Sequence, residues 1–103
     1  MQSIYHICPK TEWENARRTG SLVNNSLVEE GFIHCSRIEQ IPEVARRFFH
    51  GIPNLLLLEI DLDKLSAEVR WELVGDQRFP HVYGPLNLDA IIGVQDLTIS
   101  RIE

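Results

Sequence analysis

The sequence has little that suits a secreted or membrane-spanning protein. It contains only two cysteines, Cys8 and Cys35, and no Cys-x-x-Cys pair, so a disulfide framework is not indicated. Two buried free thiols are the expected state. The longest apolar run, at residues 55–58, is far too short to span a membrane. These features predict a cytoplasmic protein with no membrane partner.

Positive charge is also scarce. Lysine and arginine number 10 against 15 aspartates and glutamates, which gives a formal net charge of −5. An acidic protein repels phosphate backbones, and the pair Arg46 and Arg47 is too short to form a basic patch. We therefore expect no nucleic-acid partner.

Linkers, repeats and low-complexity runs are likewise missing. The 103 residues, with 44% hydrophobic and 24% charged residues, have the size and composition of one globular domain. A chain of this length buries enough surface for one core without staples. We predict a single domain over residues 1–103.

The hydrophobic pattern predicts an α+β fold. Strands are expected at residues 3–8, 32–36, 55–60, 68–74, 80–84 and 90–100, with helices at residues 12–18 and from about residue 41 to a stop before Gly51. The apolar strand 55–60 is expected to be central, because both of its faces must be covered. Helices cluster early and strands late, which favours two early helices packed on a mixed, mostly antiparallel sheet.

Local signals set the expected helix ends. Thr11 with Glu14 and Ser36 with Glu39 have the spacing of capping boxes. Residues 21–30 are polar and predict a loop. In the second helix we expect Phe48 to point inward.

Three of the four histidines fall in predicted strands. His6, His34 and His81 have the polar same-face companions Cys8, Ser36 and Tyr83 respectively. We expect these motifs to converge on one polar site; the alternative is that the imidazoles complete the core, with hydrogen-bond partners there. His50, near a helix end, is expected to be structural.

The same residues also suit two other types of chemistry, zinc binding and nucleophilic catalysis by cysteine. His6, Cys8, His34 and His81 are donor types that zinc accepts, but their spacing follows no local metal-binding pattern, so no metal is assigned. Cys8 or Cys35 could pair with a histidine as a nucleophile. In a regular strand, however, Cys35 points away from His34.

The segment Phe-Pro-His-Val-Tyr-Gly-Pro-Leu at residues 79–86 is the least like ordinary core sequence. Pro80, Gly84 and Pro85 fix a rigid path that presents His81 and Tyr83. Rigid aromatic and imidazole groups suit a nucleotide or another planar ligand. The alternative is an edge strand followed by a turn.

With these motifs, the chain resembles, from end to end, the bacterial family called Domain of Unknown Function 952. The resemblance rests on Ile4-Tyr5-His6-Ile7, Trp13, Ser26-Leu27, Glu30-Gly31-Phe32-Ile33-His34-Cys35-Ser36, Gln40, Leu58-Glu59-Ile60-Asp61 and residues 79–86. It implies a fold like that of the ADP-ribosyltransferases, in which NAD binds in a cleft between two small sheets.

The resemblance also implies roles for residues. His6 matches the first-strand position that holds NAD, while His34 and Ser36 would line the cleft. The late strand would usually supply a glutamate; none lies in residues 79–86, and Glu72 is the nearest carboxylate upstream. His81 or Tyr83 would then take that role.

The resulting prediction is a small domain that binds or acts on NAD, as a substrate, or on an ADP-ribosyl group; no cofactor is assigned. The candidate catalytic residues are His34, His81 and Tyr83. The candidate substrate-binding residues are His6, Ser36, Glu72, Phe79 and Gly84. The alternative is a non-catalytic module for a nucleotide or a protein partner, whose nature the sequence leaves open.

Overall fold

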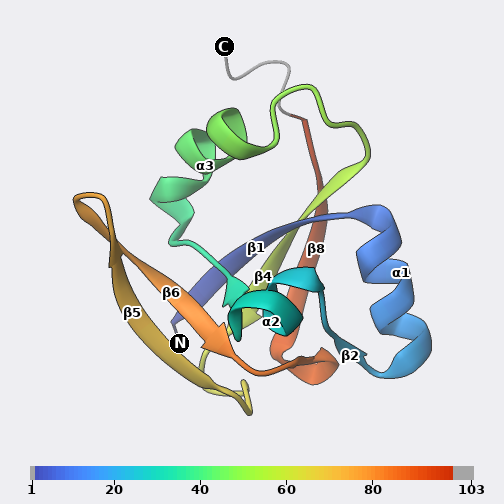
Figure 1. Ribbon diagram of the computed structural model, residues 1–103. Coiled ribbons are helices and arrows are strands. Elements are labelled where there is room, and N and C mark those ends of the chain that lie inside the picture. The colour runs from blue at the N-terminus through green and yellow to red at the C-terminus, as the bar shows by residue number, and fades with distance from the viewer. Residues whose placement is uncertain (1, 99–103) are drawn as a thin grey trace.

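The computed structural model describes residues 2–98, which form eight strands, three α-helices and two 3₁₀ turns (Figure 1). In chain order the elements are β1 (Ser3–Pro9), α1 (Lys10–Thr19), β2 (Ser21–Leu22), α2 (Asn25–Glu30), β3 (Ile33–His34), η1 (Ile38–Gln40), α3 (Ile41–Phe48), β4 (Leu55–Asp61), β5 (Glu68–Val74), β6 (Gln77–Tyr83), β7 (Leu86–Asn87), η2 (Leu88–Ala90) and β8 (Ile91–Leu97). The α+β class is confirmed.

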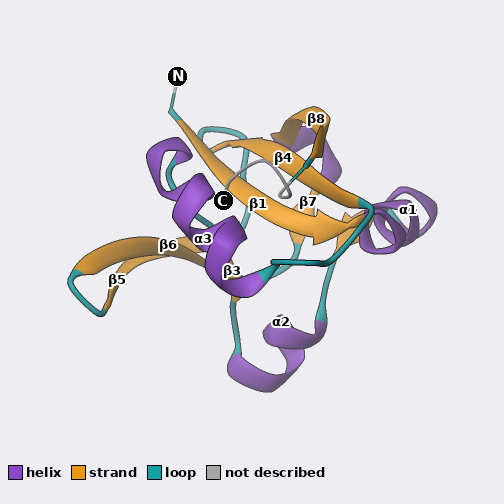
Figure 2. Cartoon of the chain, turned by 90° about the horizontal axis from the view of Figure 1, so that it is seen from above, coloured by secondary structure: helices purple, strands orange, loops and turns teal. Residues whose placement is uncertain are grey.

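The strands form three small sheets rather than one. Their orders are β1-β4-β8, β2-β7 and β3-β6-β5. Every pairing among the described strands is antiparallel, so the mixed sheet expected from the sequence is wrong. The three sheets interleave along the chain, because only β5 and β6 are consecutive strands of the same sheet, and the hairpin β5–β6 extends away from β1 and β4 (Figure 2).

Strand β4 is central in its sheet, as its apolar sequence predicted. Leu56, Leu58 and Ile60 join the larger core cluster, together with residues of β1, β6 and α1. The opposite face presents Leu55 and Leu57 to the smaller cluster beneath α3. Both faces are therefore covered, and two cores meet at one strand.

The strand β1 connects two of the sheets. Along one edge it pairs with β4 over its whole length. Along the other edge it pairs only at Tyr5, whose N–H donates to the carbonyl of Ser36 and whose carbonyl accepts from the N–H of Ser36, both at 2.8 Å. The segment after β3 thus crosses from the β3-β6-β5 sheet to the edge of β1 at this point.

The predicted loop at residues 21–30 is wrong, because it contains β2 and a third helix, α2. Asn24 begins that helix: its side-chain oxygen accepts from the N–H of Leu27 at 3.0 Å. Gly31 ends it in the left-handed conformation, with φ 91°. The asparagines that read as loop residues are therefore the start of a helix.

Both predicted capping boxes are also wrong. Helix α1 starts directly after Pro9, with no side-chain cap. The turn η1 starts one residue later than expected, where the N–H of Arg37 donates to Oε1 of Gln40 at 2.9 Å. Phe48, expected inside, is 66% exposed, because only Ile41 and Ala45 of α3 are fully covered.

The last strands agree more closely with the sequence. The strand expected at residues 80–84 begins earlier, since β6 pairs with β5 from Gln77 onward. Strand β8 shifts register opposite Glu59 and Ile60, beside Gly93. The end of the predicted closing strand, residues 99–100, lies outside the described residues. Within residues 2–98, no helix is both long and apolar enough to cross a membrane.

Candidate functional site

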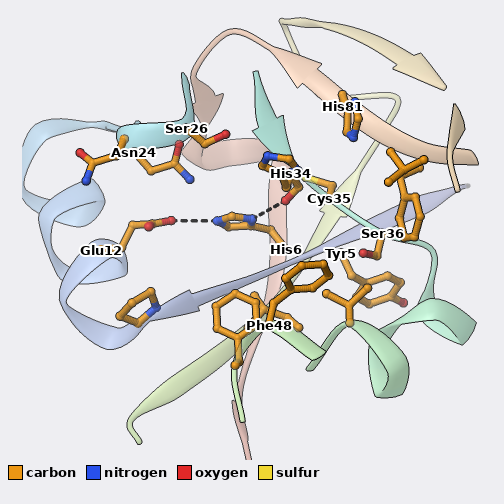
Figure 3. Close-up of a pocket in the computed structure, with 17 residues that line it drawn as sticks. Tyr5, His6, Glu12, Asn24, Ser26, His34, Cys35, Ser36, Phe48 and His81 are labelled. Atoms are coloured by element: carbon orange, nitrogen blue, oxygen red, sulfur yellow. Dashed lines mark hydrogen bonds and ion pairs between the residues drawn. The ribbon is translucent and has the colours of Figure 1, made fainter. Parts of the chain in front are cut away.

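A pocket of about 510 Å³ lies where β1, α3 and the β3–β6 sheet meet the start of α2. Its polar side is formed by side chains from β1, α1, the α2 start, β3 and β6, many of them labelled in Figure 3. The lining residues are Tyr5, His6, Ile7, Pro9, Glu12, Asn24, Asn25, Ser26, His34, Cys35, Ser36, Val44, Phe48, Phe49, Val74, Phe79 and His81.

His6 lies buried at the centre of the polar side (Figure 3). Its Nε2 is 2.8 Å from Oε2 of Glu12, and its Nδ1 is 2.8 Å from the carbonyl oxygen of His34. A carbonyl oxygen can only accept a hydrogen bond, and the same holds for an ionised carboxylate. A ring that donates at both nitrogens carries a positive charge, so His6 and Glu12 form an imidazolium–carboxylate pair.

The pKa of His6 agrees with this assignment. Burial by itself lowers the pKa, but the neighbouring Cys35 side chain and the hydrogen bond to Glu12 outweigh burial and raise it to about 10. At neutral pH, His6 is therefore positive and Glu12 negative, and the pair has no net charge. Since both His6 nitrogens are occupied, the group that this pair can offer to a ligand is the second oxygen of Glu12.

Sequence reasoning missed Glu12. A signal was present, since Glu12 lies in the first turn of a helix that follows directly on the strand carrying His6. Side chains at the end of a strand and in the next helical turn lie close in space. The misplaced cap at Thr11 started the helix too late and obscured this proximity.

His6, Cys8 and Glu12 also place one donor atom each within 4.8 Å of one another. These are zinc donor types. However, Nε2 of His6 already donates to Glu12, and burial together with the charge of Glu12 raises the pKa of the Cys8 thiol to about 12. A metal would have to displace both protons, so we assign none to this group. Cys8 and Cys35 are both free and buried, as expected.

His81 is the second buried histidine of the site and is held on three sides. It is the cross-strand partner of His34, with ring centroids 5.3 Å apart. The ring of Phe32 stacks on it at 4.1 Å and 19°. Its Nδ1 lies 2.7 Å from Oε1 of Glu72.

The same oxygen of Glu72 accepts from the hydroxyl of Tyr83 at 2.6 Å. These hydrogen bonds, from Tyr83 first and His81 second, hold the pKa of Glu72 below its ordinary value, and the pKa of Tyr83 is raised. The Arg70 guanidinium lies 4.1 Å from the centre of the Tyr83 ring. Glu72 is therefore an ionised anchor for both side chains.

The structure brings most of the predicted site residues together. His6, His34, Ser36, Phe79 and His81 line the pocket. Glu72 and Tyr83 are not among the described residues that line the pocket. Glu72 is hydrogen-bonded to His81, and Tyr83 is hydrogen-bonded to Glu72. His50, expected to be structural, is exposed in the turn after α3.

Gly84 is separate from the pocket. A Cβ at that position would lie 2.9 Å from Cβ of Ala67, so glycine is needed there for close packing between two segments. This gives Gly84 a structural explanation that involves no ligand.

Sequence reasoning also missed much of the remaining wall. Asn24, Asn25 and Ser26 enter the pocket because α2 replaces the expected loop. Phe48 joins it because the side chain is turned outward. Composition gave no sign of either, because both depend on where a short helix ends or begins.

Comparison with known proteins identifies a family. The family described as "Protein of unknown function (DUF952)" matches residues 7–94. Among curated proteins none matches the chain. The chain is similar to the crystal structure of protein CC0527 from Caulobacter crescentus, with 35% identity and a TM-score of 0.86 over 94% of this chain and 87% of that one. The solution structure of the same protein gives 36% identity and a TM-score of 0.80, over 94% and 85% of the two chains.

Proposed function

The chain belongs to the DUF952 family, and we propose that it binds NAD or an ADP-ribosyl compound, with the nicotinamide-ribose end inside the pocket. One observation carries the proposal. His6, His34, Ser36 and His81, which come from three separate segments of the sequence, line a single hollow together with the aromatic ring of Phe79. Convergent polar groups in a mostly apolar pocket are typical of small-molecule sites.

The size and walls of the pocket suit a planar ring. About 510 Å³ is within the range of roughly 300–1,000 Å³ that is common for small-molecule sites. Phe48, Phe49 and Phe79, with the aliphatic Val44 and Val74, offer apolar surfaces to its faces. Ser36 and Asn25 can donate hydrogen bonds to sugar or carboxamide oxygens.

The charges restrict which part of the ligand can enter. No lysine or arginine occurs among the described residues that line the pocket, and Glu12 is acidic. A buried phosphate would find no fixed cation there. We therefore place the nicotinamide and its ribose inside and the pyrophosphate in solvent. His6 then acts through Glu12, whose second oxygen can accept from the carboxamide N–H or a ribose hydroxyl.

Catalysis is part of the proposal, with His81 as a proton-transfer group supported by Glu72 and Tyr83, and His34 as its cross-strand neighbour. Gly84 would contribute by fixing the end of β6. The cytoplasm is the proposed location, since the two cysteines are unpaired thiols.

A second candidate is a binding module without turnover. It is favoured by the occupancy of Glu72, whose Oε1 already accepts two hydrogen bonds and is less available to stabilise a developing positive charge on a ribose. The exposed Phe48 and Val74 beside the pocket would also suit a protein partner.

Calorimetric titration tests the proposal. NAD and nicotinamide riboside are expected to bind with similar affinity. ADP-ribose is expected to bind more weakly, because it lacks the nicotinamide ring. A matched pair of variants locates the site: His34→Ala is expected to weaken binding and His50→Ala to leave it unchanged, since both histidines are exposed but only His34 lines the pocket. Absence of binding by all three compounds at millimolar concentration would rule the proposal out. Binding without nicotinamide release would favour the second candidate.

A further inference from the structure

The hydrogen bond of His81 to Glu72 shows which ring nitrogen carries a proton. Glu72 is ionised, and an ionised carboxylate can only accept. The proton of the 2.7 Å contact therefore lies on Nδ1 of His81. In the neutral ring the lone pair is then on Nε2.

Nε2 of His81 has access to the pocket. Among residues 2–98 it makes no hydrogen bond, whereas every polar side-chain atom that is sealed from water there has a partner. Nε2 is therefore reachable by solvent. Because His81 as a whole is only 4% exposed and lines the pocket, that access is through the pocket.

The ring cannot easily turn to exchange its two nitrogens. Phe32 covers one face, His34 meets it edge to face, and Glu72 with Tyr83 fixes Nδ1. The charged and titratable groups around it are Glu72 and Arg70 on β5, Tyr83 on β6 and His34 on β3. The ring is thus fixed with an acceptor atom turned into a ligand-sized hollow.

We propose that Nε2 of His81 is the proton acceptor of this site, aimed at a hydroxyl group of the ligand or at a water beside it, and that Glu72 is its positioning residue. The inference rests on the proposed function for the identity of the ligand. In the transfer, the O–H bond breaks, an N–H bond forms at Nε2, and the oxygen keeps the electron pair. The imidazolium that results is paired with the carboxylate of Glu72.

Nitrogen-15 spectra of the histidine rings test the role of Glu72 without any ligand. In its neutral form, wild-type His81 is expected to carry its proton on Nδ1. Glu72→Gln should populate both tautomers, because an amide can accept from Nδ1 or donate to it. Glu68→Gln is the matched control: it removes a charge from the same strand and leaves the partner of His81 in place. Tyr83→Phe should keep the Nδ1 proton, because Glu72 remains.

A neutral wild-type ring with its proton on Nε2, or a Glu72→Gln spectrum identical to that of the wild type, would overturn the inference. Adding NAD to the same samples tests whether Nε2 of His81 faces the ligand. The Nε2 resonance is expected to shift, and Glu72→Gln to weaken NAD binding by about three- to tenfold.

Two outcomes of the titration separate this inference from the proposed function. If NAD perturbs His34 and other lining residues but leaves Nε2 of His81 unshifted, the inference fails and the proposed function stands. If NAD perturbs no lining residue, the proposed function fails together with the ligand assignment, and the tautomer spectra still decide whether Glu72 positions His81.

Discussion

The His6 ring and the Glu12 carboxylate form an ion pair on the polar side of the pocket, with Nε2 of His6 2.8 Å from Oε2 of Glu12. Burial lowers the pKa of His6, but the neighbouring Cys35 side chain and the hydrogen bond to Glu12 raise it to about 10 from an ordinary 6.5. A raised pKa means that the folded protein binds a proton that the unfolded chain releases. The resulting stability is complete below pH 6.5 and is lost as pH rises toward 10.

We therefore predict that the free energy of unfolding falls by about 2–3 kcal/mol between pH 6.5 and 9, measured by urea denaturation. The measurement stops at pH 9 because of Cys8. Burial raises the pKa of its thiol from 9.0 to about 12, so its titration lowers the free energy of unfolding further only above pH 9. Glu12→Gln should reduce the slope below pH 9, because Glu12 supplies part of the rise in the His6 pKa and Cys35 supplies the rest. Glu14→Gln, on the same helix but exposed, should retain it. An unchanged slope in Glu12→Gln would show that another group titrates.

The sequence predicted the strands well where their pattern is continuous. The run at residues 55–60 and the alternation at 68–74 are local signals, and β4 and β5 follow them. The short elements were different. Asn24 begins α2 only because the chain must turn between β2 and β3, and two-residue strands such as β3 carry no periodicity of their own.

The candidate site was predictable to the same extent. Histidines in strands signalled an unusual polar cluster, since His6, His34 and His81 do line one pocket. Their partners were not predictable, because Glu12 and Phe32 reach the rings through tertiary contacts that no spacing encodes. The resemblance to a family indicated these residues, and the hydrogen bonds then showed that both ring nitrogens of His6 have partners, while His81 is bonded through Nδ1.

His34 and His81 should respond differently to truncation, although they are cross-strand partners. His81 is buried and hydrogen-bonded to Glu72, so His81→Ala should cost about 1–3 kcal/mol of stability. The His34 side chain is 55% exposed and pairs with the exposed Glu30, so His34→Ala should cost less than about 1 kcal/mol. Thermal and urea denaturation at pH 7 measure both. If both variants lost stability equally and by a large amount, both histidines would have a structural role.

Phe48 offers a test that separates binding from folding. It lines the pocket yet is 66% exposed, so Phe48→Ala should change stability by about 0.5 kcal/mol or less. If it covers the ligand, NAD affinity should fall by about three- to tenfold in calorimetric titration. Val28→Ala is the control, because Val28 is 82% exposed and lies away from the lining residues. Unaltered affinity in Phe48→Ala would remove this side chain from the site.

Gly84 should behave as a packing residue rather than a binding residue. A Cβ added there meets Cβ of Ala67 at 2.9 Å, so Gly84→Ala forces two segments apart and should cost about 1–3 kcal/mol. Ala67→Gly removes the opposing atom, and the double variant Gly84→Ala with Ala67→Gly should recover much of that loss. A double-mutant cycle by urea denaturation measures the coupling. NAD affinity of the folded fraction should stay within about twofold of the wild type, because neither residue lines the pocket. A large drop in affinity with little loss of stability would instead return Gly84 to the ligand site.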